Sequence, residues 1–472
     1  MGSRDPQNPN VWILYQGVRA EHEGMLLFAD SALLDSRNNN FTAYDNVKIQ
    51  ISDTTFIYGD NLFYDAPTRI IDIYADTVVF IDGETVMRTA HLSFDRMSGI
   101  ASYSTWGRTT NHDQLLESRQ GFYNSNTKMM EIFRHVLLSD SSMVLRTDTL
   151  YYHVDSKLAS FVSPTEIESD STFIYSEKGT YNTETRHAVS TKASHIASRS
   201  YLLSCDSLHY FGNIERGEAF GHVTIIDTVN AITCQGRLGV TDMQNSYSYV
   251  TDSALVFMIH EGDTLFMHAD TVYVDNDSTR QFTAIRAFRH AKVFRFDCQG
   301  MCDSIHYNVP DSLMALHGNP VLWYEHYQCF ADTIAMLHDT SGIAWVKLRH
   351  NLFIAEWVDS LRYNQLKGRN GILYFSQGKP AYADILGNAQ MVYYVTEDDP
   401  QGNPTLIGVN AGVSSDMRIY FQDSKMHRLL SYVNPDMHTY PVDKLPDELY
   451  RLHGFRWFES RRPKSREEVF VW

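Results

Sequence analysis

Residues 58–65 read Tyr58-Gly59-Asp60-Asn61-Leu62-Phe63-Tyr64-Asp65, a phrase that returns along the chain about every thirty residues. Further copies stand at Arg146–Tyr152, Cys205–Tyr210 and Cys302–Asn308. In each copy an Asp, here called the anchor, is followed by an apolar residue two positions on and by Tyr four positions on. A fixed period of this size is the signature of stacked supersecondary units. The sequence therefore predicts a stack of similar rungs rather than one compact core.

The anchor position recurs twelve times, although Asp is not always retained there. An apolar or aromatic residue follows four positions after every anchor, and Asp or Asn follows five positions after eight of them. Asp and Asn favour turns because their side chains bond to nearby backbone. Each copy thus predicts a strand that ends in a turn. The anchors are Asp30, Asp60, Ala90, Arg119, Asp148, Glu177, Asp206, Gly236, Asp270, Asp303, Asp332 and Asp359.

A second strand is predicted between successive anchors. Phe41–Ile49, Gly217–Ile225 and Ala287–Phe294 alternate apolar and polar residues, as half-buried strands do. Before residue 440 no segment has a sustained helical period. The predicted fold class is all-β: an elongated stack of about twelve two-strand repeats of roughly thirty residues, or roughly two dozen strands.

The residues two and four positions after each anchor are predicted to face the interior of the stack, because those between them are small or polar. Lighter residues on the intermediate strands, such as Ala43, Ala101 and Ala159, favour an interior with room for a groove, but they also permit tight packing of the sheets. The candidate groove residues are Leu62, Tyr64, Leu92, Phe94, Leu150, Tyr152, Leu208, Tyr210, Ile305 and Tyr307.

The bulk composition bounds the class of protein. The 472 residues are 43% hydrophobic, as in a folded chain, and carry a net charge of −17, which disfavours nucleic acid as a partner. No stretch is long and apolar enough for a transmembrane helix. Met1–Pro6 is typical of a leader added for expression. We expect residues 1–10 to be a disordered leader, 11–400 the stack with two or three family-sized units, 401–440 the last strands or cap, and 441–472 a basic tail.

No catalytic motif is present, so the sequence predicts a protein that is not an enzyme and needs no cofactor. The five Cys residues are expected to be buried thiols. Cys298, Cys302 and His306 would spread over about 27 Å of a strand, too far apart to share a metal ion. The repeated anchors could instead form a carboxylate ladder for sugar or calcium, and the Tyr residues a sugar track. A carbohydrate-active enzyme would need its carboxylates concentrated in one place, and they are not.

The end of the chain differs from the rest, since Arg451–Arg466 is basic and aromatic within an acidic protein. Two interpretations remain open. This segment is either a docking tail for a partner, or a cap that folds onto the last rung.

The strand Glu218–Ile225, the early Ala29-Asp30 and the stretch Phe41–Ile49 resemble the OstA/LptA-like family of periplasmic lipopolysaccharide-transport bridge proteins. Tyr440–Asp443 and Gly454–Ser465 resemble the long OstA-like members of Bacteroidetes-type bacteria. The resemblance implies a U-shaped, semi-closed β-jellyroll whose apolar groove shields the acyl chains of lipid A.

The resemblance also implies a role and partners. The protein would carry lipopolysaccharide across the periplasm toward the outer membrane, its native signal peptide having been removed. It would join other lipopolysaccharide-transport components by edge-strand addition, or associate end to end with itself. The alternative that the residues leave open is a structural or assembly spacer: a β-solenoid with a packed interior.

Overall fold

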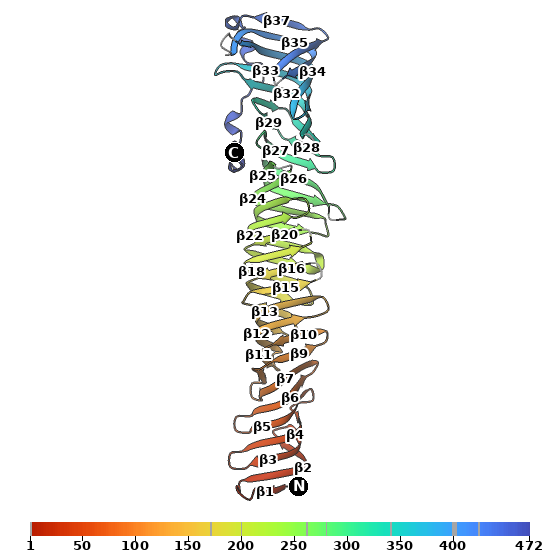
Figure 1. Ribbon diagram of the computed structural model, residues 1–472, viewed down its shortest axis with the longest axis vertical. Coiled ribbons are helices and arrows are strands. Elements are labelled where there is room, and N and C mark those ends of the chain that lie inside the picture. The colour runs from red at the N-terminus through yellow and green to blue at the C-terminus, as the bar shows by residue number, and fades with distance from the viewer. Residues whose placement is uncertain are drawn as a thin grey trace. The chain divides into compact units, whose positions relative to one another are not determined.

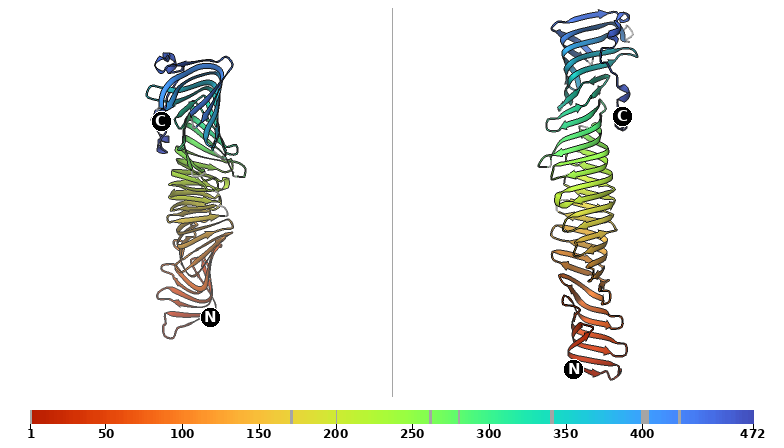
Figure 2. Two further views of the ribbon diagram at one scale, coloured as in Figure 1. Left: turned by 45° about the horizontal axis from the view of Figure 1, so that its top comes forward. Right: turned by 180° about the vertical axis from the view of Figure 1, so that it is seen from behind.

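The computed structural model describes residues 2–169, 172–199, 201–260, 263–279, 281–339, 342–398, 404–422 and 425–472. The chain divides into two compact units, Met1–Ala219 and Phe220–Trp472, drawn in Figure 1. Both consist of antiparallel strands that stack as rungs, which Figure 2 shows from two further sides. The predicted all-β, repeat-built fold is therefore confirmed. The division at residue 219 falls inside the single stack predicted for residues 11–400, and the predicted boundary at residue 400 lies outside the described residues.

The strands of the N-terminal unit follow one another as a meander. They are β1 (Gly2–Arg4), β2 (Val11–His22), β3 (Met25–Asp35), β4 (Asn40–Gln50), β5 (Thr55–Asp65), β6 (Ile70–Asp82), β7 (Thr85–Asp95), β8 (Ile100–Tyr103), β9 (Gly107–Asn111), β10 (Gln114–Ser118), β11 (Gln120–Asn124), β12 (Met129–Ser139), β13 (Met143–His153), β14 (Leu158–Phe161), β15 (Thr165–Ser169), β16 (Thr172–Ser176), β17 (Lys178–Asn182), β18 (His187–Lys192), β19 (Ser194–Ser198), β20 (Tyr201–Cys205) and β21 (Ser207–Phe211), followed by the 3₁₀ helix η1 (Gly212–Ile214).

The unit boundary falls within β22 (Arg216–Asp227), and the strands of the C-terminal unit become longer toward its end. They are β23 (Ile232–Asp242), β24 (Tyr247–His260), β25 (Asp263–Asn276), β26 (Phe282–Phe294), β27 (Cys298–Asn308), β28 (Leu313–His317), β29 (Val321–Tyr324), β30 (Tyr327–Phe330), β31 (Thr333–Asp339), β32 (Gly342–Trp357), β33 (Tyr363–Ser376), β34 (Lys379–Asp398), β35 (Pro404–Gln422), β36 (Lys425–Tyr432) and β37 (Asp436–Tyr440).

Each rung is bent at its middle, where the register of the ladder shifts. Between β5 and β6 the shift lies between Tyr58 and Asn61, which places Asp60 at the bend. Elsewhere the bend splits a strand in two, as it does between β8 and β9. A bulge of this kind sharpens the local twist and turns the strand. The two halves of the bent strands form two half-sheets that face each other, as the contact of Phe80 with Tyr123 across the interior shows (ring centroids 5.9 Å apart).

The anchors of the repeat mark these bends, with one exception. Asp30, Asp148 and Asp270 all fall at register shifts. Asp359 was predicted to continue the series but lies in the turn after β32, while the bend of β33 lies between Lys367 and Asn370. The prediction was wrong there because β32 to β35 are lengthened, so a period of about thirty residues no longer spans one pair of strands.

Several of the Asp and Asn residues five positions after the anchors close turns as predicted, whereas Asp275 bonds Arg286 and Asn364 lies within β33. Asp95 accepts a hydrogen bond from the backbone N–H of Met97 at 2.8 Å, and Asn182 accepts one from Thr185 at 2.8 Å. These are Asx turns, in which the side chain replaces a backbone partner.

Tyr and Ala residues alternate along the interior of the N-terminal unit. Ala159 lies between Tyr152 and Tyr181 in the ladder, and Ala188 lies between Tyr181 and Tyr210. Because Ala159 and Ala188 are both buried, the small residues accommodate the Tyr rings. Of the two interpretations of these light residues, the structure favours tight packing in this unit.

Residues 2–4, which we expected to belong to a disordered leader, form β1 and pair with Trp12–Leu14 of β2. A free strand edge offers unpaired backbone N–H and C=O groups, so a short neighbouring segment such as residues 2–4 can pair with it. The five Cys residues are free and buried, as predicted.

The C-terminal segment, residues 441–472, forms only short helical turns: η2 (Val442–Lys444), α1 (Asp447–Tyr450), η3 (Glu459–Arg461) and η4 (Glu467–Phe470). It lies against the C-terminal unit, where Leu445, Leu452 and Val469 are buried. Figure 1 shows it descending beside the strands to the labelled C-terminus near β27. The segment therefore folds onto the stack, as the cap interpretation predicted, but it covers several rungs and not the last one alone.

Candidate functional site: an apolar cleft in the C-terminal unit

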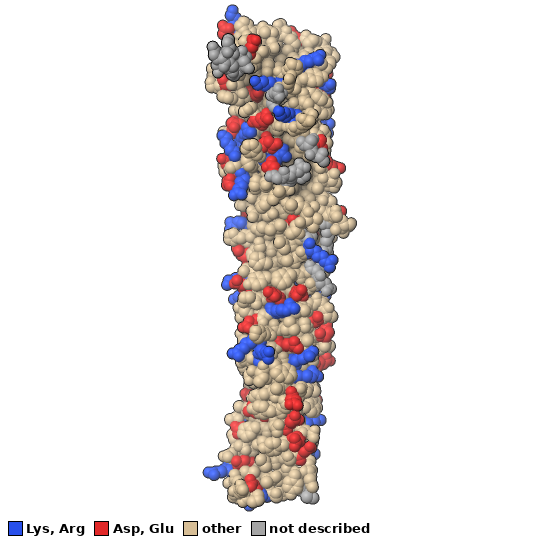
Figure 3. All heavy atoms as spheres, in the orientation of Figure 1, with Lys and Arg blue, Asp and Glu red and all other residues tan. Residues whose placement is uncertain are grey.

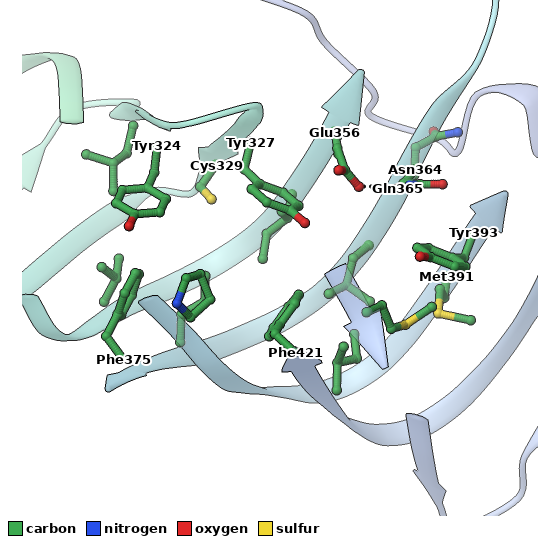
Figure 4. Close-up of a pocket in the computed structure, with 18 of the residues that line it drawn as sticks. Tyr324, Tyr327, Cys329, Glu356, Asn364, Gln365, Phe375, Met391, Tyr393 and Phe421 are labelled. Atoms are coloured by element: carbon green, nitrogen blue, oxygen red, sulfur yellow. Dashed lines mark hydrogen bonds between the residues drawn. The ribbon is translucent and has the colours of Figure 1, made fainter. Parts of the chain in front are cut away.

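The two half-sheets of the C-terminal unit part between β29 and β36 and leave an apolar cleft (Figure 4). One wall comes from β29 and β30 with the second half of β32, the first half of β33 and the second half of β34. The other comes from the first halves of β32 and β34, the second halves of β33 and β35, and β36. Tyr324 faces Phe375 across it at 5.4 Å, and Tyr327 faces Phe421 at 6.5 Å (ring centroids). Its lining includes Leu322, Tyr327, Ile354, Leu373, Met391 and Phe421.

The cleft is narrow. Its cavity volume is about 80 Å³, below the several hundred Å³ of a typical small-molecule site. A narrow apolar slot suits a hydrocarbon chain better than a bulky polar ring, because dispersion contacts are lost where walls and ligand do not touch.

The cleft has one polar end. Asn364 Nδ2 donates a hydrogen bond to Glu356 Oε2 at 2.8 Å, and Tyr327 lies beside them. Burial, opposed by the Asn364 hydrogen bond and by the charges of His326 and Lys425, raises the pKa of Glu356 above its ordinary 4.5. Burial also raises the pKa of Tyr324 to about 12, and Tyr324 Oη donates to the carbonyl of Gly378 at 2.6 Å. The walls therefore carry few charges: Glu356 and Asn364 form one polar end, and Tyr324 lies toward the other end (Figure 4).

Glu356→Gln is expected to stabilise the protein at neutral pH and not in acid. A carboxyl whose pKa is raised by folding ionises first in the unfolded chain, so the wild type loses stability as pH rises from about 4.5 through the raised pKa. The amide of Gln does not ionise, so the variant does not lose stability in this way. Urea unfolding of both proteins at about pH 4 and about pH 8 measures the difference in the free energy of unfolding. A difference between variant and wild type that does not grow with pH would contradict the assignment.

The ten candidate groove residues lie elsewhere. Eight of them are buried, and Tyr210 and Tyr307 are half-buried. None of the ten lines the cleft. Leu150 and Leu208 are fully buried, so in the N-terminal unit the inward set forms packed interior. Whether any of the ten touches lipid stays a prediction.

Side chains also bridge the two edges of the N-terminal unit, where the turns of the facing half-sheets meet. Asp82 accepts hydrogen bonds from Tyr123 Oη at 2.7 Å and from Lys128 Nζ at 2.6 Å. Tyr152 Oη donates to Gln114 Oε1. These bonds join opposite edges, so the interior there is closed on the side away from the bends.

Three edge bridges in the N-terminal unit, each donated by Arg or Lys, share one spacing along the sequence between donor and acceptor. Arg69 Nη2 bonds Glu23, Lys128 Nζ bonds Asp82 and Lys157 Nζ bonds Asn111, and each donor stands 46 residues after its acceptor. In the cleft of the C-terminal unit, the described cross-edge bond is the one from Tyr324 to Gly378.

The sequence analysis missed the cleft because its residues do not follow the anchor phrase. Leu322, Tyr324 and Tyr327 lie on the short strands β29 and β30, and Ile354 and Met391 lie on strands of 16 and 20 residues. A signal was available, since apolar residues become consecutive rather than alternating at Val321–Trp323 and Leu352–Ala355. Such runs indicate strands that are buried on both faces.

Two further findings concern the described residues only. No group of three or more His, Cys, Asp and Glu side chains among them is placed to hold a metal ion. None of the helices in the described ranges is long and apolar enough to cross a membrane. Acidic and basic side chains intermingle over the face of the molecule visible in Figure 3.

Comparisons with known proteins found a family model and solved structures that are similar to this chain. A solved structure that the chain is similar to is the crystal structure of LptH, the LptA homologous periplasmic component of the conserved lipopolysaccharide transport device from Pseudomonas aeruginosa. The two are 12% identical, with a TM-score of 0.22, over 23% of this chain and 82% of that one. No curated protein matches the chain. The family model described as OstA-like protein matches residues 2–134 and, in an overlapping second match, residues 115–206. The resemblance seen in the sequence is thus confirmed over residues 2–206, the part of the chain that the family model matches.

Proposed function

We propose that this protein binds lipopolysaccharide without acting as an enzyme and serves as part of a transport bridge across the periplasm toward the outer membrane. The observation that carries the proposal is the apolar cleft between the half-sheets of the C-terminal unit. The OstA-like match of residues 2–206 supports the same class of function.

The cleft provides the chemistry that an acyl chain requires. Transfer of each methylene group from water to an apolar wall is worth about 0.8 kcal/mol, so even part of a lipid A acyl chain gains several times that amount. The gain depends on apolar contact rather than on fixed hydrogen bonds, so a chain can slide with small changes in energy. Sugars and phosphates would remain at the mouth, in water.

The strand edges give the proposed partners a means of attachment. β1 covers only Trp12–Leu14 of β2, and β36 pairs with β35 alone among the described strands. A free edge presents unpaired N–H and C=O groups, which another strand can complete. We propose that other lipopolysaccharide-transport components, or a second copy of this chain, add to these edges.

A specific observation favours a second function for one part of the chain. The interior of the N-terminal unit is filled by buried apolar residues, with Tyr and Ala alternating from Tyr152 to Tyr210, and edge bridges close it. A packed, closed stack fits a structural spacer, and this unit could fill that role while the cleft binds lipid.

Native mass spectrometry of the protein purified from its own cell envelope, with extraction of the bound lipid, tests the proposal. We expect a glycolipid bound in a fixed ratio to the chain. A lipid-free mass that stays unchanged after incubation with lipopolysaccharide would contradict lipid binding and leave the spacer as the better function.

A further inference from the structure

The strands that form one wall of the cleft are buried on both faces. Leu322 and Ile354 point into the cleft, whereas their neighbours Trp323 and Phe353 point to the other side of the sheet. Trp323 and Phe353 are only 0% and 2% exposed. One face of an antiparallel sheet commonly meets water, so something must cover this one. The C-terminal segment, residues 441–472, does so.

Two buried glutamines hold the segment by its backbone. Gln365 Nε2 donates to the carbonyl of Tyr450 at 3.0 Å, and Gln365 Oε1 accepts from the N–H of Leu452 at 2.8 Å. Gln328 Nε2 likewise donates to the carbonyl of Arg456 at 2.9 Å, and Gln328 Oε1 accepts from the N–H of Phe458 at 2.7 Å. Each amide thus bonds two backbone groups two residues apart, as a neighbouring strand does.

Apolar contacts complete the attachment. Phe458 packs edge-on against Phe330 at 5.9 Å and lies in the cluster of Trp323, while Phe455 packs against Phe353 at 5.9 Å (ring centroids). Phe455 thus lies between the two pairs of glutamine hydrogen bonds, and Phe458 belongs to the second pair.

The far end of the segment is held as well. Lys292 Nζ donates to the carbonyls of Arg461 and Val471, and the indole N–H of Trp472 donates to the carbonyl of His290 at 3.1 Å. Phe470 contacts the ring of His268 at 4.5 Å. The segment is therefore attached over β25 to β35, and its part from Leu445 to Phe458 lies on the outer face of strands that line the cleft.

We infer that the C-terminal segment is a brace that sets the position of the cleft wall, and that Gln328 and Gln365 are the positioning residues through which it acts. Because each wall strand presents one side chain to the cleft and the next to the brace, the wall cannot move without breaking contacts on its outer face. Loss of the brace exposes Trp323 and Phe353 to water, which favours their movement inward and a change in the width of the cleft. The consequence for lipid affinity rests on the proposed function; the coupling of brace to wall does not.

The cleft contains its own reporters, since Cys298 and Cys329 line it. Cys234 on β23 is equally buried, lies outside the cleft lining, and serves as an internal control. Burial raises the pKa of all three thiols to about 12, so each reacts slowly until its site opens. Labelling by N-ethylmaleimide, read peptide by peptide by mass spectrometry, reports the opening of each site.

The test compares the wild type, the double variant Gln328→Leu/Gln365→Leu and the matched control Gln235→Leu, whose side chain is exposed on β23. We expect Cys298 and Cys329 to label about tenfold faster in the double variant, with Cys234 unchanged, because only the wall opens. Gln235→Leu should match the wild type. Should the double variant fail to fold, Phe458→Ala gives the same comparison with a smaller expected rise.

A second readout uses dansylundecanoic acid as an amphiphilic probe of the cleft. Because Gln365 lines the cleft and Gln328 does not, this readout uses Gln328→Leu alone, which we expect to bind the probe about tenfold more weakly than the wild type. Unchanged labelling of Cys298 and Cys329 in both the double variant and Phe458→Ala would overturn the brace, as would equal acceleration at Cys234. Faster labelling of the two cleft thiols together with no probe binding by the wild type would instead reject the proposed function and leave the brace intact.

Discussion

Phe421→Asp is expected to lower the affinity for an acylated ligand about a hundredfold, since a carboxylate in an apolar site costs about 3 kcal/mol or more when a hydrocarbon covers it. Phe421 lies opposite Tyr327 across the cleft and is only half-buried, so the fold should tolerate the change in the absence of ligand. Titration with lipopolysaccharide or with dansylundecanoic acid measures the loss.

The matched control for that variant is Tyr420→Asp. Tyr420 is the preceding residue on β35, is also half-buried, and lies against Tyr382 and Arg428 rather than in the cleft. Lipid affinity should survive this change. An equal loss in both variants would indicate damage to β35, and no loss in Phe421→Asp would place the ligand elsewhere.

Leu150→Asp is expected to destabilise the N-terminal unit by about 4 kcal/mol or more, because it buries a charge without a partner. Leu150 is fully buried and pairs in the ladder with Ile132 and Phe161. Urea unfolding monitored by circular dichroism measures the loss of stability. Tyr151→Asp is the matched control, since Tyr151 is only half-buried and points to the opposite face.

The outcome also decides where lipid can lie. A Leu150→Asp protein that keeps its stability but loses lipid would show that the interior of the N-terminal unit is an open groove, as the sequence suggested. A destabilised protein whose C-terminal unit still binds the probe would support a packed N-terminal unit and a lipid site confined to the cleft.

The rungs could be predicted from the sequence because their determinants are local. Asp60 marks a bend, Leu62 and Tyr64 mark the inward face, and Asp65 precedes a turn, all within six residues. These preferences act through the period of two along a strand and through side-chain bonds in turns. A single sequence is sufficient to identify them.

The cleft could not be predicted in the same way. Tyr327 and Phe421 lie on facing half-sheets and are more than ninety residues apart in the chain. No local pattern in the sequence encodes the distance between them. The attachment of the C-terminal segment was also hidden, because Gln328 and Gln365 are unremarkable polar residues until Leu452 and Phe458 reach them. The consecutive apolar residues at Val321–Trp323 and Leu352–Ala355 were the sequence signal that a second layer exists.

The regular edge bridges of the N-terminal unit have a consequence for how such a chain can change in length. Lys128 and Lys157 are 29 residues apart, and so are their acceptors Asp82 and Asn111. Duplication or loss of one two-strand repeat therefore moves donor and acceptor together, and only the bonds that span the junction must find a new partner. An architecture with this property can be lengthened or shortened in whole rungs by a single genetic event, without redesign of its remaining closures.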